Sequence, residues 1–234
     1  MSALNTAFAH WGVRVVGPLP GGHRNAVWLV ERGPELCVAK TTRRTEAALA
    51  WLGPVQALAR RCGIGAPGLL RDNAGRFAPG GVTLEPFLAG RAGPPGWRMA
   101  LAPRVAAFHK AAAGMVQRPG FCSVAVLRRV PRGGDIDLSA MPPRLVQACR
   151  AAWAGLGPES VLHGDLVASN VIGTATGPAL VDWDECRRDA VVLEAPMSGP
   201  VSQRVARARL AWEVAACWRL EPGRARRLVR TLLN

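Results

Sequence analysis

Four polar residues in one short segment have the chemistry that phosphoryl transfer needs. His163, Asp165 and Asn170 lie in a loop that leaves an apolar run, and Asp182 ends a second apolar run. The amide oxygen of Asn170 and the carboxylate of Asp182 are hard oxygen ligands of the kind that Mg²⁺ takes. Asp165 could orient a hydroxyl nucleophile and accept its proton. Because phosphoryl transfer requires little beyond positioning and neutralisation of charge, these residue types favour that reaction.

Three short strands must position these side chains. Apolar runs predict strands at residues 161–163, 170–173 and 179–182, and the turn sequence TATGP joins the last two. A hairpin of this kind would bring Asn170 close to Asp182. The alternative interpretation is an ordinary strand–turn–strand whose acidic residues are merely solvated.

The pattern H-G-D-x-x-x-x-N, followed by an apolar strand that leads into D-W-D, resembles the aminoglycoside phosphotransferase-like family. That family shares the protein-kinase fold and includes antibiotic kinases and enzymes of the choline kinase and homoserine kinase type. The resemblance implies that Asp165 is the catalytic base and that Asn170 and Asp182 bind Mg²⁺. It also implies a structural role for His163 and ATP as the phosphoryl donor.

Two stretches depart from the related patterns. Gly164 stands where protein kinases have the Arg that answers activation-loop phosphorylation, which suggests a kinase without that switch. Family members usually have a His-Pro-Gly-like run before the Asn, whereas residues 167–169 here are VAS. This difference affects the detail of the loop but not the two metal ligands.

The N-terminal third agrees with a nucleotide-binding lobe. Gly21, Gly22 and Asn25 lie in a turn-rich loop that resembles the family's loop over the nucleotide phosphates, although a Gly-Gly turn by itself is more often a plain hairpin. Strands are predicted at residues 26–31 and 36–41. Lys40, on the second strand, resembles the family's phosphate-binding Lys. Lys40 and Lys110 are the only lysines among thirty basic residues, which favours a specific role for Lys40 over a solvated surface role.

Two further positions follow from the same resemblance. Glu46 is the expected partner of Lys40, at the start of a helix that Thr45 would cap, and the alternative is that Glu46 only complements the helix N-terminus. Glu85 and Phe87 lie in a segment that resembles the hinge whose backbone binds adenine. The alternative there is a strand that leaves a domain.

The expected fold class is α+β, a two-lobed protein-kinase-like fold with a small β-rich N-lobe and a mainly helical C-lobe. The Gly- and Pro-rich stretch at 89–97 places the N-lobe at residues 1–88 and the C-lobe at 89–234. Further strands are expected at 13–16, 68–71 and 82–87. Helices are expected from residue 46, with a break or kink at 53–54, and at 97–113, 143–154, 201–220 and 222–233. His109 and Glu194 are expected to be structural.

The charge balance bears on the acceptor substrate. Thirty basic residues against sixteen acidic ones give a net charge of +14, which favours anionic partners such as nucleotides and repels polycations. Only eleven acidic residues follow residue 88. We therefore expect a neutral or anionic small-molecule substrate with a hydroxyl group, and not a polycationic aminoglycoside.

Composition also bears on location and on other functions. No apolar run is long enough to span a membrane, no export signal is visible, and the six cysteines are scattered, so we expect a cytoplasmic protein with reduced thiols. A non-catalytic kinase-like protein that binds nucleotide or nucleic acid is the alternative function, although no stacking platform or nucleic-acid motif supports it. A protein kinase is less favoured, since no long activation segment follows Asp182. The choice between ATP and GTP stays open.

Overall fold

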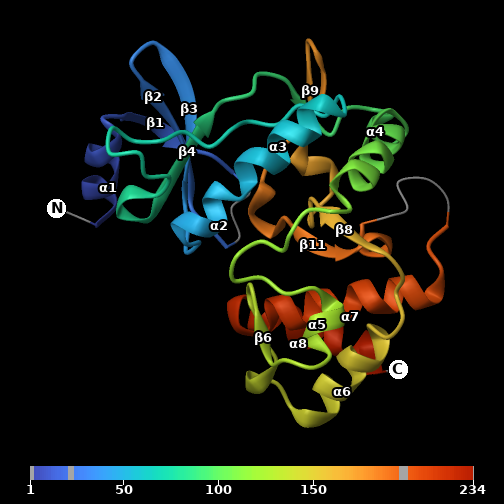
Figure 1. The fold of residues 1–234 in the computed structure, drawn as a ribbon. Coiled ribbons are helices and arrows are strands. Elements are labelled where there is room, and N and C mark those ends of the chain that lie inside the picture. The colour runs from blue at the N-terminus through green and yellow to red at the C-terminus, as the bar shows by residue number, and fades with distance from the viewer. Residues whose placement is uncertain (1–2, 21–23, 195–199, 234) are drawn as a thin grey trace. The chain divides into compact units, whose positions relative to one another are not determined.

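The structure, a computed structural model, describes residues 3–20, 24–194 and 200–233. The chain forms two compact units: residues 1–94 with 168–181, and residues 95–167 with 182–234. The first is rich in strands and the second is mainly helical (Figure 1). The hairpin at 168–181, expected in the C-lobe, belongs by its contacts to the first unit. None of the helices described is long and apolar enough to cross a membrane.

The first unit is built on a four-stranded antiparallel sheet in the order β1-β2-β3-β4. The strands are β1 (Arg14–Pro18), β2 (Val27–Arg32), β3 (Glu35–Thr41) and β4 (Val82–Pro86). The β2–β3 hairpin, in register from Val27 opposite Lys40 to Arg32 opposite Glu35, confirms the two predicted strands and the turn between them. On β3, Cys37 and Ala39 are buried and alternate with the partly exposed Val38 and Lys40. Lys40 therefore lies on the face of the sheet opposite that core.

A helix that the sequence analysis did not predict covers one side of this sheet. Helix α1 (Ala3–Trp11) buries Ala7, Phe8 and Trp11 in a core cluster with residues of β2, β3 and β4. The indole Nε1 of Trp11 donates a hydrogen bond to the carbonyl of Val82 over 2.8 Å. The sequence N-terminal to residue 12 thus contributes to the core of the first unit.

The predicted helix from residue 46 is present and is interrupted earlier than expected. Thr45 caps α2 (Glu46–Ala50) by accepting a hydrogen bond from the Ala48 N–H, as predicted. The interruption falls at Trp51, and α3 (Leu52–Arg61) begins directly after it. Pro54 is then the third residue of α3, where a proline removes no intrahelical hydrogen bond.

The strand expected at residues 68–71 is absent. Instead, an extended segment runs along β4, and the Leu70 N–H donates a hydrogen bond to the Leu84 carbonyl over 2.8 Å. A short turn, η1 (Pro79–Gly81), leads from this segment into β4. The expected hairpin is therefore a long loop that contacts the outer edge of the sheet.

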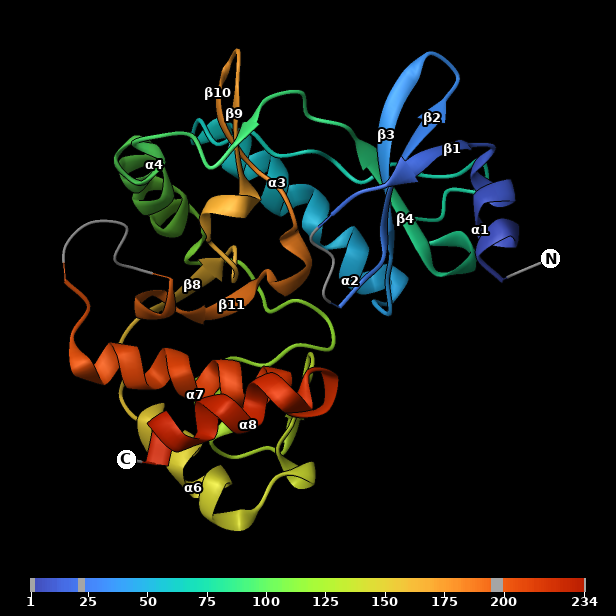
Figure 2. The same ribbon diagram turned by 180° about the vertical axis from the view of Figure 1, so that it is seen from behind.

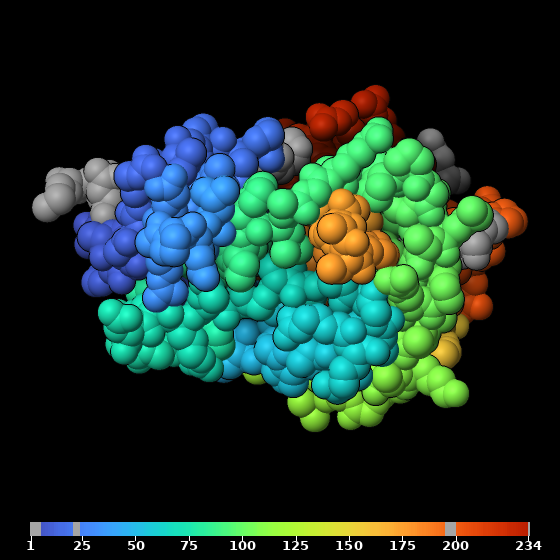
Figure 3. Space-filling view, turned by 90° about the horizontal axis from the view of Figure 1, so that it is seen from above, coloured from blue at the N-terminus to red at the C-terminus, as the bar shows by residue number. Residues whose placement is uncertain are grey.

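A second, three-stranded sheet in the first unit has the order β10-β9-β5. Its strands are β5 (Arg91–Ala92), β9 (Val171–Thr174) and β10 (Gly177–Leu180). Glycines allow close backbone approach here: a Cβ on Gly90 would overlap the carbonyl of Gly173, and one on Gly65 would lie 2.7 Å from the Cβ of Ala179. In Figure 3 the β9–β10 hairpin (orange) lies next to the cyan surface of the same unit, in agreement with the bridge between Gly65 and Ala179.

The second unit contains five helices within its described residues. They are α4 (Trp97–Ala112), α5 (Val124–Leu127), α6 (Pro143–Ala152), α7 (Gln203–Leu220) and α8 (Pro222–Leu233). The four longer ones confirm the predicted helices. Helices α7 and α8 lie side by side and both contact α6 (Figure 2), and together they bury Leu145, Trp153, Val214 and Leu232 in the main core.

Two small antiparallel sheets complete this unit. One pairs β8 (Glu159–Leu162) with β11 (Arg187–Ala190), and the other pairs β6 (Arg132–Gly133) with β7 (Ile136–Asp137). Strand β8 is buried along Ser160, Val161 and Leu162. It leads directly into His163, so the candidate catalytic loop starts from a fixed, buried strand.

Candidate functional site

The candidate catalytic loop, which begins at His163, is held by one buried carboxylate, that of Glu194. His163 is 1 % exposed, and its ring meets the Trp183 ring edge-on at 4.8 Å between centroids. The N–H groups of His163 and Gly164 donate to Glu194 Oε2 and Oε1 over 3.2 and 2.8 Å. Glu194 thereby satisfies two main-chain donors of the loop at once and fixes its path.

Glu194 is itself bound by a second histidine. The Nε2 atom of His109, on α4, lies 2.8 Å from Glu194 Oε2, and both side chains are buried. Burial alone raises the pKa of Glu194, but the hydrogen bond from His109 and its charge outweigh burial and lower the pKa below its ordinary value. His109 and Glu194 are therefore structural residues, as expected, and Glu194 is one that supports the site directly.

Gly164 is required by the space around it. Its φ of +90° lies in the region that favours glycine, and a Cβ there would overlap the carbonyl oxygen of Glu185 and lie 2.9 Å from Arg187 Nη1. Arg187 is 2 % exposed and pairs with the buried Asp189 over 2.9 Å. Gly164, at the position where protein kinases have Arg, therefore lies next to Arg187, a buried arginine whose charge is balanced by Asp189.

Asp165 is exposed at the end of the loop. Its N–H donates to His163 Nδ1 over 3.4 Å, and its carbonyl accepts from the Val167 N–H over 3.0 Å. These two contacts fold the chain tightly around the aspartate. Its main chain is thus fixed, while the residue itself is exposed.

Asp182 has an unusual backbone. Its φ of 61° and ψ of 62° make it the one non-glycine residue with positive φ in the described chain. It stands at the N-terminus of the turn η4 (Trp183–Glu185) without a side-chain capping bond. Such conformations cost about 1–3 kcal/mol and cluster at functional sites.

Asn170 lies in the first unit, one residue before β9. Its carbonyl accepts a hydrogen bond from the Val181 N–H over 3.0 Å, so Asn170 stands directly across the hairpin from Val181. Asp182 is the next residue along the chain. The hairpin confirms the two expected strands, but the strands run at 171–174 and 177–180, with Val171 opposite Leu180, so the turn is shorter than the five-residue turn expected.

Lys40 and Glu46 lie in the first unit on β3 and at the start of α2. The carboxylate of Glu46 accepts hydrogen bonds from the main-chain N–H groups of Phe77 and Ala78, the nearest over 2.9 Å each. Glu46 therefore anchors the loop that precedes β4, a role that the sequence did not indicate. The Lys40–Glu46 ion pair stays a prediction.

The loop that the sequence analysis expects over the nucleotide phosphates lies only partly within the described residues. Gly21 and Gly22 lie outside the described residues. Asn25, with its amide nitrogen facing two carbonyls, donates to Arg24 and Thr41 over 3.2 Å each. Asn25 thus ties the end of the loop to β3.

The segment expected to bind adenine presents its main-chain groups alternately to the two sides of β4. The Phe87 N–H donates to the Leu36 carbonyl of β3 over 3.0 Å, and Glu85 lies opposite Val38, so both backbones face β3. The carbonyls of Val82 and Leu84 instead face the outer edge of β4. Because strands alternate, the carbonyl of Pro86 faces that outer edge too.

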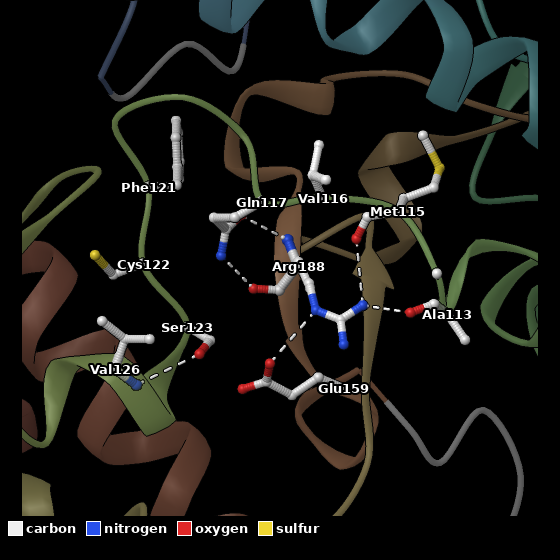
Figure 4. A pocket seen from close by; sticks show the side chains of 11 residues that line it. Ala113, Met115, Val116, Gln117, Phe121, Cys122, Ser123, Val126, Glu159 and Arg188 are labelled. Carbon is white, nitrogen blue, oxygen red and sulfur yellow. Dashed lines mark hydrogen bonds and ion pairs between the residues drawn. The ribbon is translucent and has the colours of Figure 1, made fainter.

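A cavity of about 540 Å³ in the second unit holds none of the predicted site residues. Its wall includes Val116, Phe121 and Val126, together with Glu159 and Arg188, whose Oε2 and Nε atoms are 3.5 Å apart (Figure 4). Glu159 is the first residue of β8, four residues before His163. This cavity lies at the opposite end of β8 from the catalytic loop.

The side-chain oxygens of Asn170 and Asp182 are ligands that suit a hard divalent cation whose other ligands come from elsewhere. The described residues contain no group of three or more His, Cys, Asp and Glu side chains placed to hold a metal ion. Asn170 and Asp182 offer only two oxygen donors. Mg²⁺ is usually held by one or two protein carboxylates, with phosphate oxygens and water filling the other positions, and these two residues match that chemistry.

A strand-rich unit followed by a mainly helical unit is the architecture of protein-kinase-like phosphotransferases. Residues 15–226 match the model of the phosphotransferase enzyme family, and the chain belongs to that family. None of the curated proteins compared matches the sequence.

Solved structures agree on the fold. Macrolide 2′-phosphotransferase from Brachybacterium faecium is 18 % identical, with 92 % of this chain and 88 % of that one covered and a TM-score of 0.53. Choline kinase from Streptococcus pneumoniae is 13 % identical, with 94 % and 93 % covered and a TM-score of 0.57. An amicoumacin kinase in complex with AMP-PNP and Ca²⁺ is 12 % identical, with 92 % and 68 % covered and a TM-score of 0.58.

Proposed function

We propose that this protein is a cytoplasmic, Mg²⁺-dependent kinase that transfers the γ-phosphoryl group of ATP to a hydroxyl of a small metabolite. The observation that carries the proposal is the catalytic loop: Asp165 is exposed while Glu194 and His163 fix the main chain around it. A general base needs this combination of access and fixed position. Family membership and a relative that binds AMP-PNP and Ca²⁺ support the nucleotide and the divalent cation.

The residues divide the work as follows. Asp165 accepts the proton of the attacking hydroxyl on its carboxylate as the new O–P bond forms and the bond from the γ-phosphorus to the bridging oxygen breaks, with ADP as the leaving group. Asn170 and Asp182 hold Mg²⁺, which neutralises phosphate charge when it is bound. Lys40, on the face of the sheet opposite the core, binds the nucleotide phosphates, with Gly21, Gly22 and Asn25 in the loop beside them.

We place the adenine at the edge of β4. The expectation named Glu85 and Phe87, whose backbones are directed toward β3. Pro86 has its carbonyl on the outer edge, and the N–H of Leu88 follows two residues later. An acceptor and a donor at this spacing match the amino group and the ring nitrogen of adenine.

The acceptor substrate is neutral or anionic. Six of the eleven acidic residues after residue 88 form ion pairs inside the second unit. They are Asp137, Glu159, Asp189, Glu194, Glu213 and Glu221. Arginines or His109 balance the charge of these six residues, and the whole chain carries +14, which disfavours a polycationic substrate. This favours a sugar, an amino alcohol or a phosphorylated metabolite over an aminoglycoside.

A substrate screen tests the proposal. ADP release is measured with ATP and Mg²⁺ over a set of hydroxylated metabolites, for the natural protein and for Asp165→Asn and Asp182→Ala. General-base catalysis is worth about 10²–10⁴-fold, so Asp165→Asn should lose that much in kcat with little change in KM. Equal background in all three proteins would instead indicate a nucleotide-binding module. Saturable turnover of an aminoglycoside would overturn the assignment of the acceptor.

A further inference from the structure

A buried arginine that sequence reasoning did not single out lies directly behind the turn that follows Asp182. Arg118 is 1 % exposed and belongs to the loop between α4 and α5. Its Nη1 atom donates to the carbonyls of Asp184 and Cys186 over 2.7 and 3.1 Å and reaches the Trp183 carbonyl at 3.4 Å. One guanidinium therefore contacts three main-chain carbonyls of a single turn.

These carbonyls converge because of the conformation of Asp182. The left-handed backbone at Asp182 reverses the chain, and the turn closes with a hydrogen bond from the Cys186 N–H to the Trp183 carbonyl. Hydrogen bonds from a charged donor are stronger than those from a neutral one. Arg118 reaches all three carbonyls only while the turn keeps this shape, so it stabilises the backbone conformation of Asp182.

The side chain of Arg118 and the loop that carries it are themselves held by neighbouring residues. Its guanidinium lies over the Phe121 ring, 4.6 Å from the centroid. Next to it, Gln117 bonds both main-chain groups of Arg188 in β11: its Oε1 accepts from the N–H and its Nε2 donates to the carbonyl (Figure 4). The loop that carries Arg118 is thus fixed to the strand that follows the turn.

We propose that Arg118 is a positioning residue for the metal ligand Asp182. It holds the turn at residues 183–186 so that the carboxylate of Asp182 keeps the orientation that divalent-cation binding requires. The proposal rests on the proposed function, in which Asp182 binds Mg²⁺. Groups that orient a metal ligand typically change metal affinity by about 10–100-fold when removed.

The test measures how phosphotransfer depends on Mg²⁺ in Arg118→Met and Arg118→Lys. Methionine keeps an apolar stem against Phe121 and loses every donor, and lysine keeps the charge without the planar fork. We expect the apparent KM for Mg²⁺ to rise at least about tenfold in Arg118→Met and less in Arg118→Lys. The KM for nucleotide at saturating Mg²⁺ should not change. Amide hydrogen exchange at residues 183–186 should quicken in both.

Arg188→Met is the matched control. The guanidinium of Arg188 also donates to main-chain carbonyls, but they are those of Ala113 and Met115 and not those of the turn at residues 183–186. The Arg188→Met variant should have a lower temperature of unfolding and an unchanged apparent KM for Mg²⁺. If the apparent KM for Mg²⁺ rose as much in Arg188→Met as in Arg118→Met, the proposal would be overturned, because the change would then follow from lost stability alone.

The remaining outcomes are distinct. If Asp182→Ala loses metal dependence and both Arg118 variants keep the natural KM for Mg²⁺, the role of Arg118 is wrong and the proposed function stands. If Asp182→Ala keeps the natural metal dependence, the proposed function is wrong and the role of Arg118 falls with it. If Arg118→Met does not fold, the apparent KM for Mg²⁺ of Arg118→Lys decides whether Arg118 positions Asp182.

Discussion

Glu194 and His109 meet in the interior of the second unit, with Oε2 and Nε2 2.8 Å apart, and the same carboxylate accepts two main-chain N–H groups of the catalytic loop. The loop therefore depends on one buried ionised group. A neutral side chain of the same shape would leave at least one of these donors badly paired. The consequences for pH, for stability and for the loop can each be measured.

Acid should destabilise the protein through Glu194. Its pKa in the folded state lies below the ordinary value of 4.5. The ionised carboxylate therefore contributes stability that is fully present above about pH 4.5 and is lost as pH falls through the lower, folded-state pKa. Urea unfolding between pH 7 and pH 3 measures this loss.

Glu194→Gln isolates the contribution of this residue to the acid effect. Breaking a buried charged pair costs on the order of 3 kcal/mol, so the variant should be less stable at pH 7 by about that amount. Its stability should also change less with acid than that of the natural protein. Identical slopes of stability against pH in the two proteins would show that Glu194 is not ionised in the folded state.

Gly164→Ala should disable the loop. A non-glycine residue at positive φ costs about 1–3 kcal/mol, and the added Cβ also overlaps the Glu185 carbonyl. Displacing the loop should lower kcat by roughly 100-fold. Gly157→Ala is the control, because Gly157 has a φ of +93° and open space around its Cβ position. Gly157→Ala should lose a similar amount of conformational stability and keep its activity. Equal kcat values for the two variants would contradict the claim that the added Cβ at residue 164 displaces the loop.

Most of the fold was predictable from local patterns. Alternating apolar residues gave β2 and β3, helical spacing gave α4, α6, α7 and α8, and the TATGP turn gave the β9–β10 hairpin. Contacts between distant segments were not predictable. Helix α1 is stabilised by residues of β2, β3 and β4, and the segment at 68–71 contacts β4 through one main-chain bond at Leu70.

The site divides in the same way. His163, Gly164 and Asp165 were identifiable because their spacing is local. Arg118 was not, because its partners are 65 to 68 positions away in sequence and are carbonyls, which no residue type reveals. Glu194 offered a weak signal, as a single acid after an apolar run, and only its contacts show that it supports the loop.

Thiol labelling should separate the cysteines by burial. Burial raises the pKa of Cys149 to about 12, and Cys186 is fully buried with its pKa raised as well, so neither forms a thiolate near pH 8. Cys62 is only half-buried and should react first with a disulfide reagent. All six cysteines should react in concentrated guanidinium. Rapid reaction of Cys149 or Cys186 in the native protein would contradict the packing around β11 or α6.

A double-mutant cycle decides what Glu46 does for Lys40. If Lys40 binds the nucleotide phosphates, Lys40→Met should raise the KM for ATP about tenfold or more, since a charge-assisted contact contributes about 1.5–3 kcal/mol. If Glu46 serves only the N–H groups of Phe77 and Ala78, Glu46→Gln should lower the temperature of unfolding with little change in that KM. The double variant should then show additive effects. Non-additivity beyond about 0.5 kcal/mol would show instead that the two side chains act as a pair, with Glu46 orienting Lys40 while it also anchors the loop before β4.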